Sequence, residues 1–476
     1  MTAVARNSTT SGTSVLKIIE NWQMALLEQS GFGRTIAVSV LEEYWKRTPT
    51  SKKLYEEACE VFPGGYTRGP FQHNPYPTYM IRAQGCKIWD VDGNEYLDLL
   101  CNYGPLIYGH NPPKVLEAVT NQLQELWIGA PNEIEIKLGE KIKEFFPTTE
   151  RLLFCPTGAE ACMKAVRTYR AITGKSKIAM FDGAFHGASD SLFFSEGIPK
   201  DLTSKILLVP FNDADGVESL VKANRDDLAA MIVEPTIGNM GHQPGKPEFY
   251  KAIREITEEN EIALIFDEIV DGFRIAPGGA QERFGVKADM STVGKIVGGG
   301  FPLAAFGSTE ETMRVWSVQK STSLDVMRPP APHPGTFNDF KISMAAGLTT
   351  LNLLNPQLYE HLEKIGKRLR TGLADICSDM KIKAQITGIS SIFHILFTDD
   401  PITNYEAARR SNKLIYRIFE LSMLNKGINL GKAHSSFLSN PVTDADIEQT
   451  LGAANETLTA MKPMIRDIAP TLIEKP

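Results

Sequence analysis

Short apolar segments alternate with amphipathic stretches through the middle of the chain. Each apolar segment has four or five residues, mostly Ile, Leu, Val and Phe, as in strands that are buried on both faces. They lie at 152–155, 177–181, 206–209, 230–234, 262–266 and 303–307. Longer stretches with helical spacing separate them, for example 159–173 and 247–259. This alternation predicts an α/β fold in which helices flank a mostly parallel central sheet.

The pattern differs on the N-terminal side. Apolar residues recur at helical spacing from about 15 to 45, which predicts a helical N-terminal extension. Its apolar face could cover a partner subunit or pack on its own domain, and the sequence favours neither. Between 79 and 99, two short strand patterns flank Asp92-Gly93-Asn94, a sequence typical of a hairpin turn.

After residue 341 the pattern becomes helical again. A helical stretch at 341–379 is followed by strand-like pieces near 383–398 and 428–438 and by a last helix at 444–465. These elements predict a smaller C-terminal α/β domain. The chain is therefore expected to divide into an N-terminal helical extension, a hairpin segment that packs on the small domain, a large domain and a C-terminal small domain, at residues 1–50, 51–115, 116–340 and 341–476.

Composition limits the classes of function. A chain of 476 residues with 42% hydrophobic residues is long enough for two or three packed layers or domains. The net charge of −7 argues against a nucleic-acid partner. Six cysteines without a C-x-x-C spacing favour free thiols in a reducing compartment over a metal site. No apolar run approaches the roughly 20 residues of a membrane helix, so we expect a cytoplasmic protein without a membrane partner.

The most informative feature is Lys295, which stands between an apolar segment and three glycines. A lysine there is poorly placed to be a solvated surface charge, and desolvation makes its amine easier to deprotonate and able to form a Schiff base. Asp267 ends an apolar strand and suits a protonated pyridine nitrogen, the arrangement of a pyridoxal phosphate site. Alternatively, Asp267 caps a turn and the two residues form an ordinary buried ion pair.

Three other segments follow predicted strands, where ligands bind in such sheets. Thr157, Gly158 and Ala159 begin a helix whose amides could hold an anion, although Thr157 could simply cap it. Phe185 could stack on a cofactor ring, with His186 beside it, or both could be ordinary core and loop residues. Beyond the next strand lie Glu234 and Asn239, whose partners could instead be backbone groups of neighbouring loops.

Together these residues resemble the class III aminotransferases of the fold-type I pyridoxal phosphate superfamily, over roughly residues 55–465. The likeness is greatest to the glutamate-1-semialdehyde aminomutase branch and its relatives that handle β-amino acids. The motifs that carry it are Phe62-Pro-Gly-Gly65, Ile88-Trp-Asp-Val-Asp-Gly-Asn94, Tyr108-Gly-His110, Glu234-Pro with Gly238-Asn239, Asp267-Glu268, Gly272-Phe-Arg274 and Gly294-Lys-Ile-Val-Gly-Gly-Gly300.

The resemblance implies a role for each candidate. Lys295 would form the Schiff base and move protons, and Asp267 would bind the pyridine nitrogen. Phe185 would stack on the ring and Asn239 would approach its hydroxyl, while the remaining cofactor contacts would come from Thr157, Gly158, Ala159, His186, Glu234 and Ile269. Thr336 would reach the phosphate of the neighbouring subunit, which implies a homodimer.

The resemblance also has departures that bear on the reaction. Tyr66-Thr-Arg-Gly69 replaces the Ser-Pro-Val-Arg of the aminomutase substrate loop, and His434 aligns where that enzyme has a glutamate. Arg68 is the candidate clamp for a substrate carboxylate, because a guanidinium binds a carboxylate through two hydrogen bonds. These departures favour an aminotransferase that acts on an amino donor and an oxo acceptor, such as β-amino or β-keto compounds.

Three alternatives remain. An aminomutase or a racemase would use the same residues, and a non-catalytic binding protein could have kept the fold, although retention of Lys295 and Asp267 argues against the last.

Overall fold

A seven-stranded sheet forms the centre of the larger part of the molecule. The computed structural model describes residues 32–69, 75–318, 329–431 and 435–474. In spatial order the strands are β4 (Arg151–Cys155), β10 (Ala304–Ser308), β9 (Met290–Val293), β8 (Ala263–Glu268), β7 (Leu228–Val233), β5 (Lys177–Phe181) and β6 (Ile206–Val209). Only the pairings of β10, with β4 and with β9, are antiparallel. The predicted α/β fold with a mostly parallel sheet is therefore confirmed.

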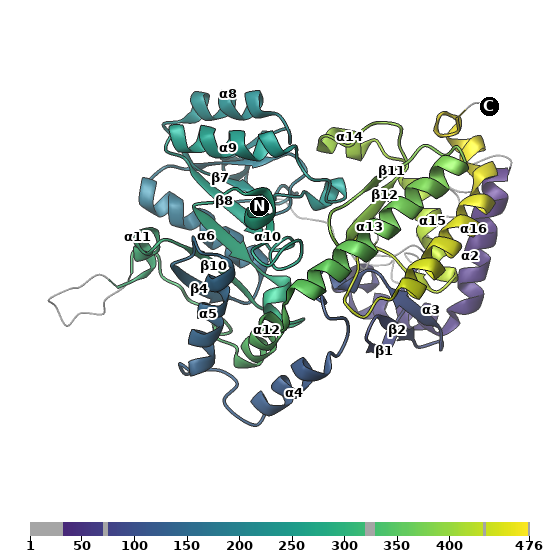
Figure 1. The fold of residues 1–476 in the computed structure, drawn as a ribbon, viewed down its shortest axis with the longest axis horizontal. Coiled ribbons are helices and arrows are strands. Elements are labelled where there is room, and N and C mark those ends of the chain that lie inside the picture. Colours follow the sequence, from purple (N-terminus) through teal and green to yellow (C-terminus); the bar gives the residue numbers. More distant parts are fainter. Residues whose placement is uncertain (1–31, 70–74, 319–328, 432–434, 475–476) are drawn as a thin grey trace, which may run out of the picture.

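Helices cover this sheet on both faces (Figure 1). In chain order the helices of this part of the chain are α4 (Pro113–Gln122), α5 (Glu133–Phe145), α6 (Gly158–Thr173), α7 (Lys200–Thr203), α8 (Ala214–Asn224), α9 (Pro247–Glu259), α10 (Gly279–Phe284), α11 (Glu310–Met313) and α12 (Lys341–Leu353), on which α4 packs. All six residues of β7 are buried, as expected of a central strand with helices on both sides. The strand predicted at 230–234 thus lies in the middle of the core.

Two smaller sheets lie on the other side of Figure 1. One contains β11 (Gln385–Thr387), β12 (Ile392–Leu396) and β14 (Ser436–Phe437), and the other has the order β1 (Met80–Gln84), β2 (Lys87–Asp90), β3 (Glu95–Asp98) and β13 (Ile428–Asn429). Because β3 pairs with β13, the segment before residue 115 packs on the C-terminal part of the chain. The domain boundaries themselves stay a prediction.

The helices around these sheets are α2 (Phe32–Arg47), α3 (Pro49–Val61), α13 (Pro356–Asp379), α14 (Tyr405–Arg409), α15 (Lys413–Asn425) and α16 (Asp444–Ile468). α2 packs against α15 and α16 of its own chain. Asn425 Nδ2 donates to the Val40 carbonyl at 2.9 Å and anchors this packing. The extension predicted from residue 15 is thus helical from 32 onwards, and its earlier part lies outside the described residues.

Two predictions about elements were wrong. The stretch 79–99 forms three strands rather than two, because a second turn at Gly85, which has a φ of +57°, separates β1 from β2. The helical stretch 341–379 is two helices, because Asn355 caps α13 and Pro356 occupies its first turn. β9 was not predicted, since its Ser and Thr interrupt the apolar pattern.

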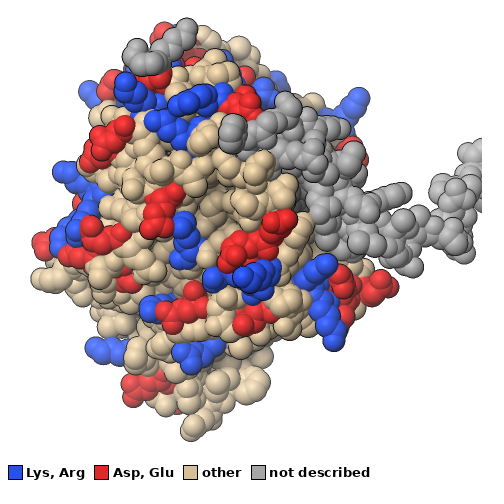
Figure 2. All heavy atoms as spheres, turned by 90° about the vertical axis from the view of Figure 1, so that its right-hand side faces the viewer, with Lys and Arg blue, Asp and Glu red and all other residues tan. Residues whose placement is uncertain are grey.

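The surface mixes both signs of charge. On the right-hand side of Figure 1, Lys and Arg are interspersed with Asp and Glu (Figure 2). Five of the six cysteines are buried and all are free, as the sequence predicted. None of the described helices combines the length and the apolar character needed to cross a bilayer.

Candidate active site

Asp267 lies at the C-terminal end of β8 and is 4% exposed. Its Oδ2 accepts hydrogen bonds from His186 Nδ1 at 2.7 Å and from Cys162 Sγ at 3.2 Å. Its Oδ1 accepts from Thr292 Oγ1 at 3.2 Å and from the Ile269 amide at 3.1 Å. Burying a carboxylate is unfavourable in free energy unless it is hydrogen-bonded. These four donors offset the lost hydration and hold the carboxylate in one orientation.

The donors to Asp267 also bear on two predictions. His186 uses Nδ1 toward the carboxylate, so this nitrogen carries the proton. His186 therefore contacts Asp267 directly, and its predicted contact with a cofactor stays a prediction. Ligand atoms of Cys162, His186 and Asp267 all lie within 4.8 Å of one another, close enough to hold a metal ion, so the expectation of a metal-free protein also stays a prediction.

Lys295 begins a short 3-10 turn, Lys295–Gly298, and has a φ of +50°, a conformation that non-glycine residues rarely adopt. Its side chain is half-buried, and its amine has no hydrogen bond or ion pair within the described part of the chain. Burial lowers the pKa of Lys295 to about 8, against the opposing charges of Glu234, Asp267 and Asp271. Backbone strain and an easily lost proton at one lysine are typical of a functional residue.

The N-terminus of α6 offers two amides to an anion. Thr157 caps the helix by accepting a hydrogen bond from the Glu160 amide at 3.2 Å. Within the described residues, the amides of Gly158 and Ala159 donate to no other group. The capping role of Thr157 and the anion site are thus compatible. Helix N-termini favour negative groups, because the helix dipole adds to the open N–H donors.

Close contacts set the position of this helix end. A Cβ on Gly158 would lie 3.0 Å from the Ile269 side chain, so the helix lies directly against the residue that follows Asp267 by two positions. A Cβ on Gly187 would lie 2.4 Å from that of Ala159, and Gly187 has a φ of +88°. Gly187 therefore allows the loop that carries Phe185 and His186 to approach α6.

Glu234 accepts hydrogen bonds from the backbone amides of Phe185 at 3.1 Å and Gly238 at 3.0 Å. Burial raises the pKa of Glu234 to about 8. Asn239 donates from Nδ2 to the Gly183 carbonyl at 2.8 Å. Both side chains thus have backbone partners, which was the alternative to a direct cofactor contact. They join the Phe185 loop to the loop after β7, and Phe185 itself stays 55% exposed.

Sequence reasoning missed a second polar network near Lys295. Thr236 donates to Asp271 from its amide at 3.0 Å and from its hydroxyl at 2.6 Å, and its hydroxyl lies 2.8 Å from His242 Nδ1. Burial lowers the pKa of His242 to about 3, which the charge of Lys295 reinforces, and burial raises that of Asp271 to about 7. No spacing rule links these residues, because Thr236 and His242 lie in the segment after β7 and Asp271 lies in the loop after β8.

Arg274 is fully buried and joins three parts of the chain. It donates to the Gly104 carbonyl at 2.6 Å, to Ser391 Oγ at 3.0 Å and to the Leu438 carbonyl at 3.1 Å. Gly104 in turn lies against Lys295, since a Cβ there would be 3.7 Å from the lysine Cδ. Arg274 therefore ties the segments beside β12 and β14 to the loop that lies against the lysine.

The predicted substrate residues are only partly described. Arg68 is exposed, donates to Asn102 Oδ1 at 2.6 Å and lies 5.0 Å from the centre of the Tyr103 ring. His434 lies outside the described residues. Thr336 is exposed, and the structure of a single chain does not test its predicted contact with a neighbouring subunit.

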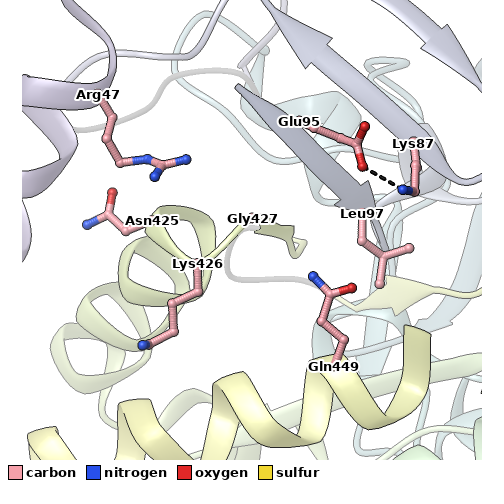
Figure 3. A pocket seen from close by; sticks show the side chains of 8 residues that line it. All are labelled: Arg47, Lys87, Glu95, Leu97, Asn425, Lys426, Gly427 and Gln449. Atoms are coloured by element: carbon pink, nitrogen blue, oxygen red, sulfur yellow. Dashed lines mark hydrogen bonds and ion pairs between the residues drawn. The ribbon is translucent and has the colours of Figure 1, made fainter. Parts of the chain in front are cut away.

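A separate pocket of about 250 Å³ lies between the end of α2, the β2–β3 hairpin and α16 (Figure 3). Two of its cations are paired, Lys87 with Glu95 at 2.5 Å and Lys426 with Glu456 at 2.6 Å. None of the predicted site residues lines it. The candidate site is instead the cluster around Lys295 and Asp267.

The cluster fits pyridoxal phosphate in three respects. Lys295 supplies an amine without a hydrogen-bond partner among the described residues, and Asp267 supplies a buried acid close enough to influence its charge. The first turn of α6 supplies open amides for a phosphate. An amine for the aldehyde, a carboxylate for the ring nitrogen and donors for the phosphate are what this cofactor requires.

Comparison with known proteins identifies the family. The model of aminotransferase class III matches residues 69–458, so the chain belongs to this family of fold-type I, pyridoxal phosphate-dependent enzymes. It is 40% identical to the glutamate-1-semialdehyde 2,1-aminomutase of Methanococcoides burtonii, over 85% of this chain and 97% of the relative.

Two solved structures are also similar. An omega-transaminase from Sphaerobacter thermophilus is 34% identical, with a TM-score of 0.81 over 87% of this chain and 98% of the other. A beta-phenylalanine aminotransferase from Variovorax paradoxus is 29% identical, with a TM-score of 0.84 over 90% and 98%. The family resemblance, the cofactor and the enzymatic nature of the protein, all predicted from the sequence, are thereby confirmed.

Proposed function

We propose that the chain is an aminomutase of the glutamate-1-semialdehyde 2,1 type, which moves an amino group between adjacent carbons of one substrate. The observation that carries this is 40% identity to such an enzyme along nearly its whole length. The motifs of the sequence favour transamination over the aminomutase reaction, whereas the similarity to known aminomutases favours the reverse order. Arg68 and His434 are retained as candidate substrate residues.

The residues of the site suit this chemistry. Bound pyridoxal phosphate supplies an electron sink for the electrons left on a substrate carbon that loses its proton. Lys295, whose pKa is lowered to about 8, has an appreciable fraction of free amine near neutral pH. Its free amine would remove the proton from the substrate carbon that carries the amino group, and its ammonium form would later give a proton to the adjacent carbon that receives the amino group. With the cofactor bound, Asp267 would accept the ring N–H, and the amides of Gly158 and Ala159 would hold the phosphate.

Transamination is the second candidate, because two similar solved structures, at 34% and 29% identity, are a transaminase and an aminotransferase. The two reactions share their first half. They differ in whether the substrate stays in the site until the amino group returns, or leaves and is replaced by a separate oxo acceptor.

Product analysis without an acceptor distinguishes them. Purified enzyme is mixed with glutamate-1-semialdehyde and no other oxo compound. The aminomutase should convert it over many turnovers to the isomer whose amino group has moved from C2 to C1, and Lys295→Ala should form none. Product limited to one equivalent of enzyme, with turnover restored by an added oxo acid, would instead favour transamination.

We also propose that the enzyme is a homodimer in which Thr336 reaches the phosphate of the neighbouring subunit. Exposed apolar side chains at the end of α4 support this, since Leu123, Leu126 and Trp127 are 38–52% exposed. The Trp127 carbonyl accepts a hydrogen bond from the Lys341 amide, which brings these side chains near the segment that carries Thr336. Sedimentation should give twice the chain mass, and Thr336→Ala should weaken cofactor binding without dissociating the dimer.

A further inference from the structure

Cys162 is a buried thiol that the proposed chemistry does not use. It lies in α6, is 1% exposed and approaches Asp267 Oδ2 to 3.2 Å. Thr292 Oγ1 is also 3.6 Å from its sulfur and 3.2 Å from the other carboxylate oxygen. Cys162, Thr292 and Asp267 therefore form a closed set of contacts around one carboxylate.

The thiol is the donor in this contact. Burial and the charge of Asp267 raise the pKa of Cys162 well above its usual value, so the sulfur keeps its proton. The Thr292 hydroxyl donates its hydrogen bond to Oδ1 of Asp267. The charged acceptor nearest to the sulfur is the other carboxylate oxygen, Oδ2. A hydrogen bond to an ionised acceptor is stronger than one between neutral groups, even from a weak donor such as a thiol.

The position of Cys162 in α6 relates its contact with Asp267 to the N-terminus of the helix. Gly158 and Cys162 are four residues apart and share one face of α6. Gly158 contacts Ile269, and Cys162 contacts Asp267, two residues earlier on the same strand end. The same helix thus contacts the carboxylate through Cys162 and carries the open first-turn amides of Gly158 and Ala159. The Cys162 contact fixes how far the helix end lies from the carboxylate.

We propose that Cys162 is a positioning residue that holds the Asp267 carboxylate in the orientation that accepts a protonated ring nitrogen. The inference rests on the proposed function, because it presumes that Asp267 meets the cofactor ring. It assigns Cys162 no direct contact with cofactor or substrate. Cys162 acts only through Asp267, together with His186 and Thr292.

Two ligands and three variants test the inference. The ligands are pyridoxal phosphate and its analogue in which carbon replaces the ring nitrogen, each titrated into cofactor-free enzyme and followed by visible absorbance. The ratio of their dissociation constants isolates the interaction with the ring nitrogen, because aldehyde and phosphate are common to both. Cys162→Ala removes the donor, Cys162→Ser keeps one, and Cys155→Ala removes another buried thiol, which faces the Thr157 carbonyl at 3.5 Å.

The wild type should prefer the natural cofactor. Cys162→Ala should lower this preference roughly fivefold, the scale of one ordinary hydrogen bond, because a thiol is a weak donor even to a charged acceptor. Cys162→Ser should keep most of it, and Cys155→Ala should leave the ratio unchanged. Thermal unfolding of the cofactor-free variants checks that each is folded, and Cys162→Val, which also lacks a donor, takes the place of Cys162→Ala if that variant does not fold.

Two outcomes would contradict the account at different levels. If Cys162→Ala weakens both ligands equally, or neither, the thiol is merely part of the core and the inference is wrong. If the wild type itself does not discriminate between the ligands, Asp267 does not meet the ring nitrogen and the proposed role of Asp267 fails first.

Discussion

At the scale of single residues, the site depends on two side chains in contrasting situations. Asp267 is buried among four hydrogen-bond donors, whereas the Lys295 amine has no such partner among the described residues. Lys164 and Lys341 are buried more deeply, but each is held by carboxylates, Lys164 by Glu160 at 2.9 Å and Lys341 by Asp339 at 2.9 Å. Burial without an ion pair thus distinguishes Lys295 from the other buried lysines.

The burial of the Lys295 amine predicts how the rate of its reaction with the cofactor depends on pH. Only the neutral amine attacks an aldehyde, and burial lowers the pKa of Lys295 to about 8 from a usual 10.5. The rate at which cofactor-free enzyme gains visible absorbance with pyridoxal phosphate should therefore rise with pH and level off above about 8. Stopped-flow absorbance from pH 6 to 10.5 measures this. A rate that still climbs steeply above pH 10 would show that the lysine is not desolvated.

At the scale of elements, the sequence predicted the positions of the strands better than the contacts between strands and helices. Six of the seven strands of the large sheet appear within about two residues of their predicted positions, because each is marked in the sequence by a short, mostly apolar run. β9 was missed, and with it the pairing that places Thr292 beside Asp267. Cys162 was missed because the sequence does not show which face of α6 meets the sheet.

Because the loop that carries His186 lies close to α6, alanine substitutions at two glycines of this region should differ in their effect. Gly187 and Gly197 have φ values of +88° and +89°, but a Cβ would clash with Ala159 only at Gly187 and would meet no atom within 4 Å at Gly197. Gly197→Ala should cost about 1 kcal/mol of unfolding free energy through its backbone conformation alone. Gly187→Ala should cost about 1–3 kcal/mol more by overpacking and should weaken cofactor binding at least tenfold.

Denaturant unfolding and cofactor titration measure both variants. Equal losses in the two would mean that the clash at Gly187 is relieved by movement of the loop. In that case α6 and the Phe185 loop would not need the close contact seen here.

At the scale of the whole molecule, the site lies where three parts of the chain meet. Arg274, in the loop after β8, bonds to Gly104 of the N-terminal segment and to Ser391 and Leu438 of the C-terminal part. The motif that includes Arg274 was noticed in the sequence, but its partners are 117–170 residues away and no periodicity identifies them. Long-range contacts of this kind are what the sequence alone could not supply.

Arg274→Met should therefore weaken the coupling between the part of the chain built on the seven-stranded sheet and the C-terminal part. It removes three hydrogen bonds from a charged donor and leaves two buried carbonyls without their partner, at a cost of about 3 kcal/mol or more. Arg370→Met is the matched control, because Arg370 bonds to the Ser390 and Ile392 carbonyls within the C-terminal part only. Calorimetry should resolve two transitions for Arg274→Met and one for Arg370→Met. A single transition in both would assign no coupling role to Arg274.

The central claim is that Lys295 bonds covalently to the cofactor. Reduction of the cofactor-loaded enzyme with borohydride makes such a bond permanent, and peptide mass spectrometry then locates it. We predict the added pyridoxyl mass on the peptide that contains Lys295. The same mass on Lys164 or Lys341, or on no lysine at all, would contradict the account.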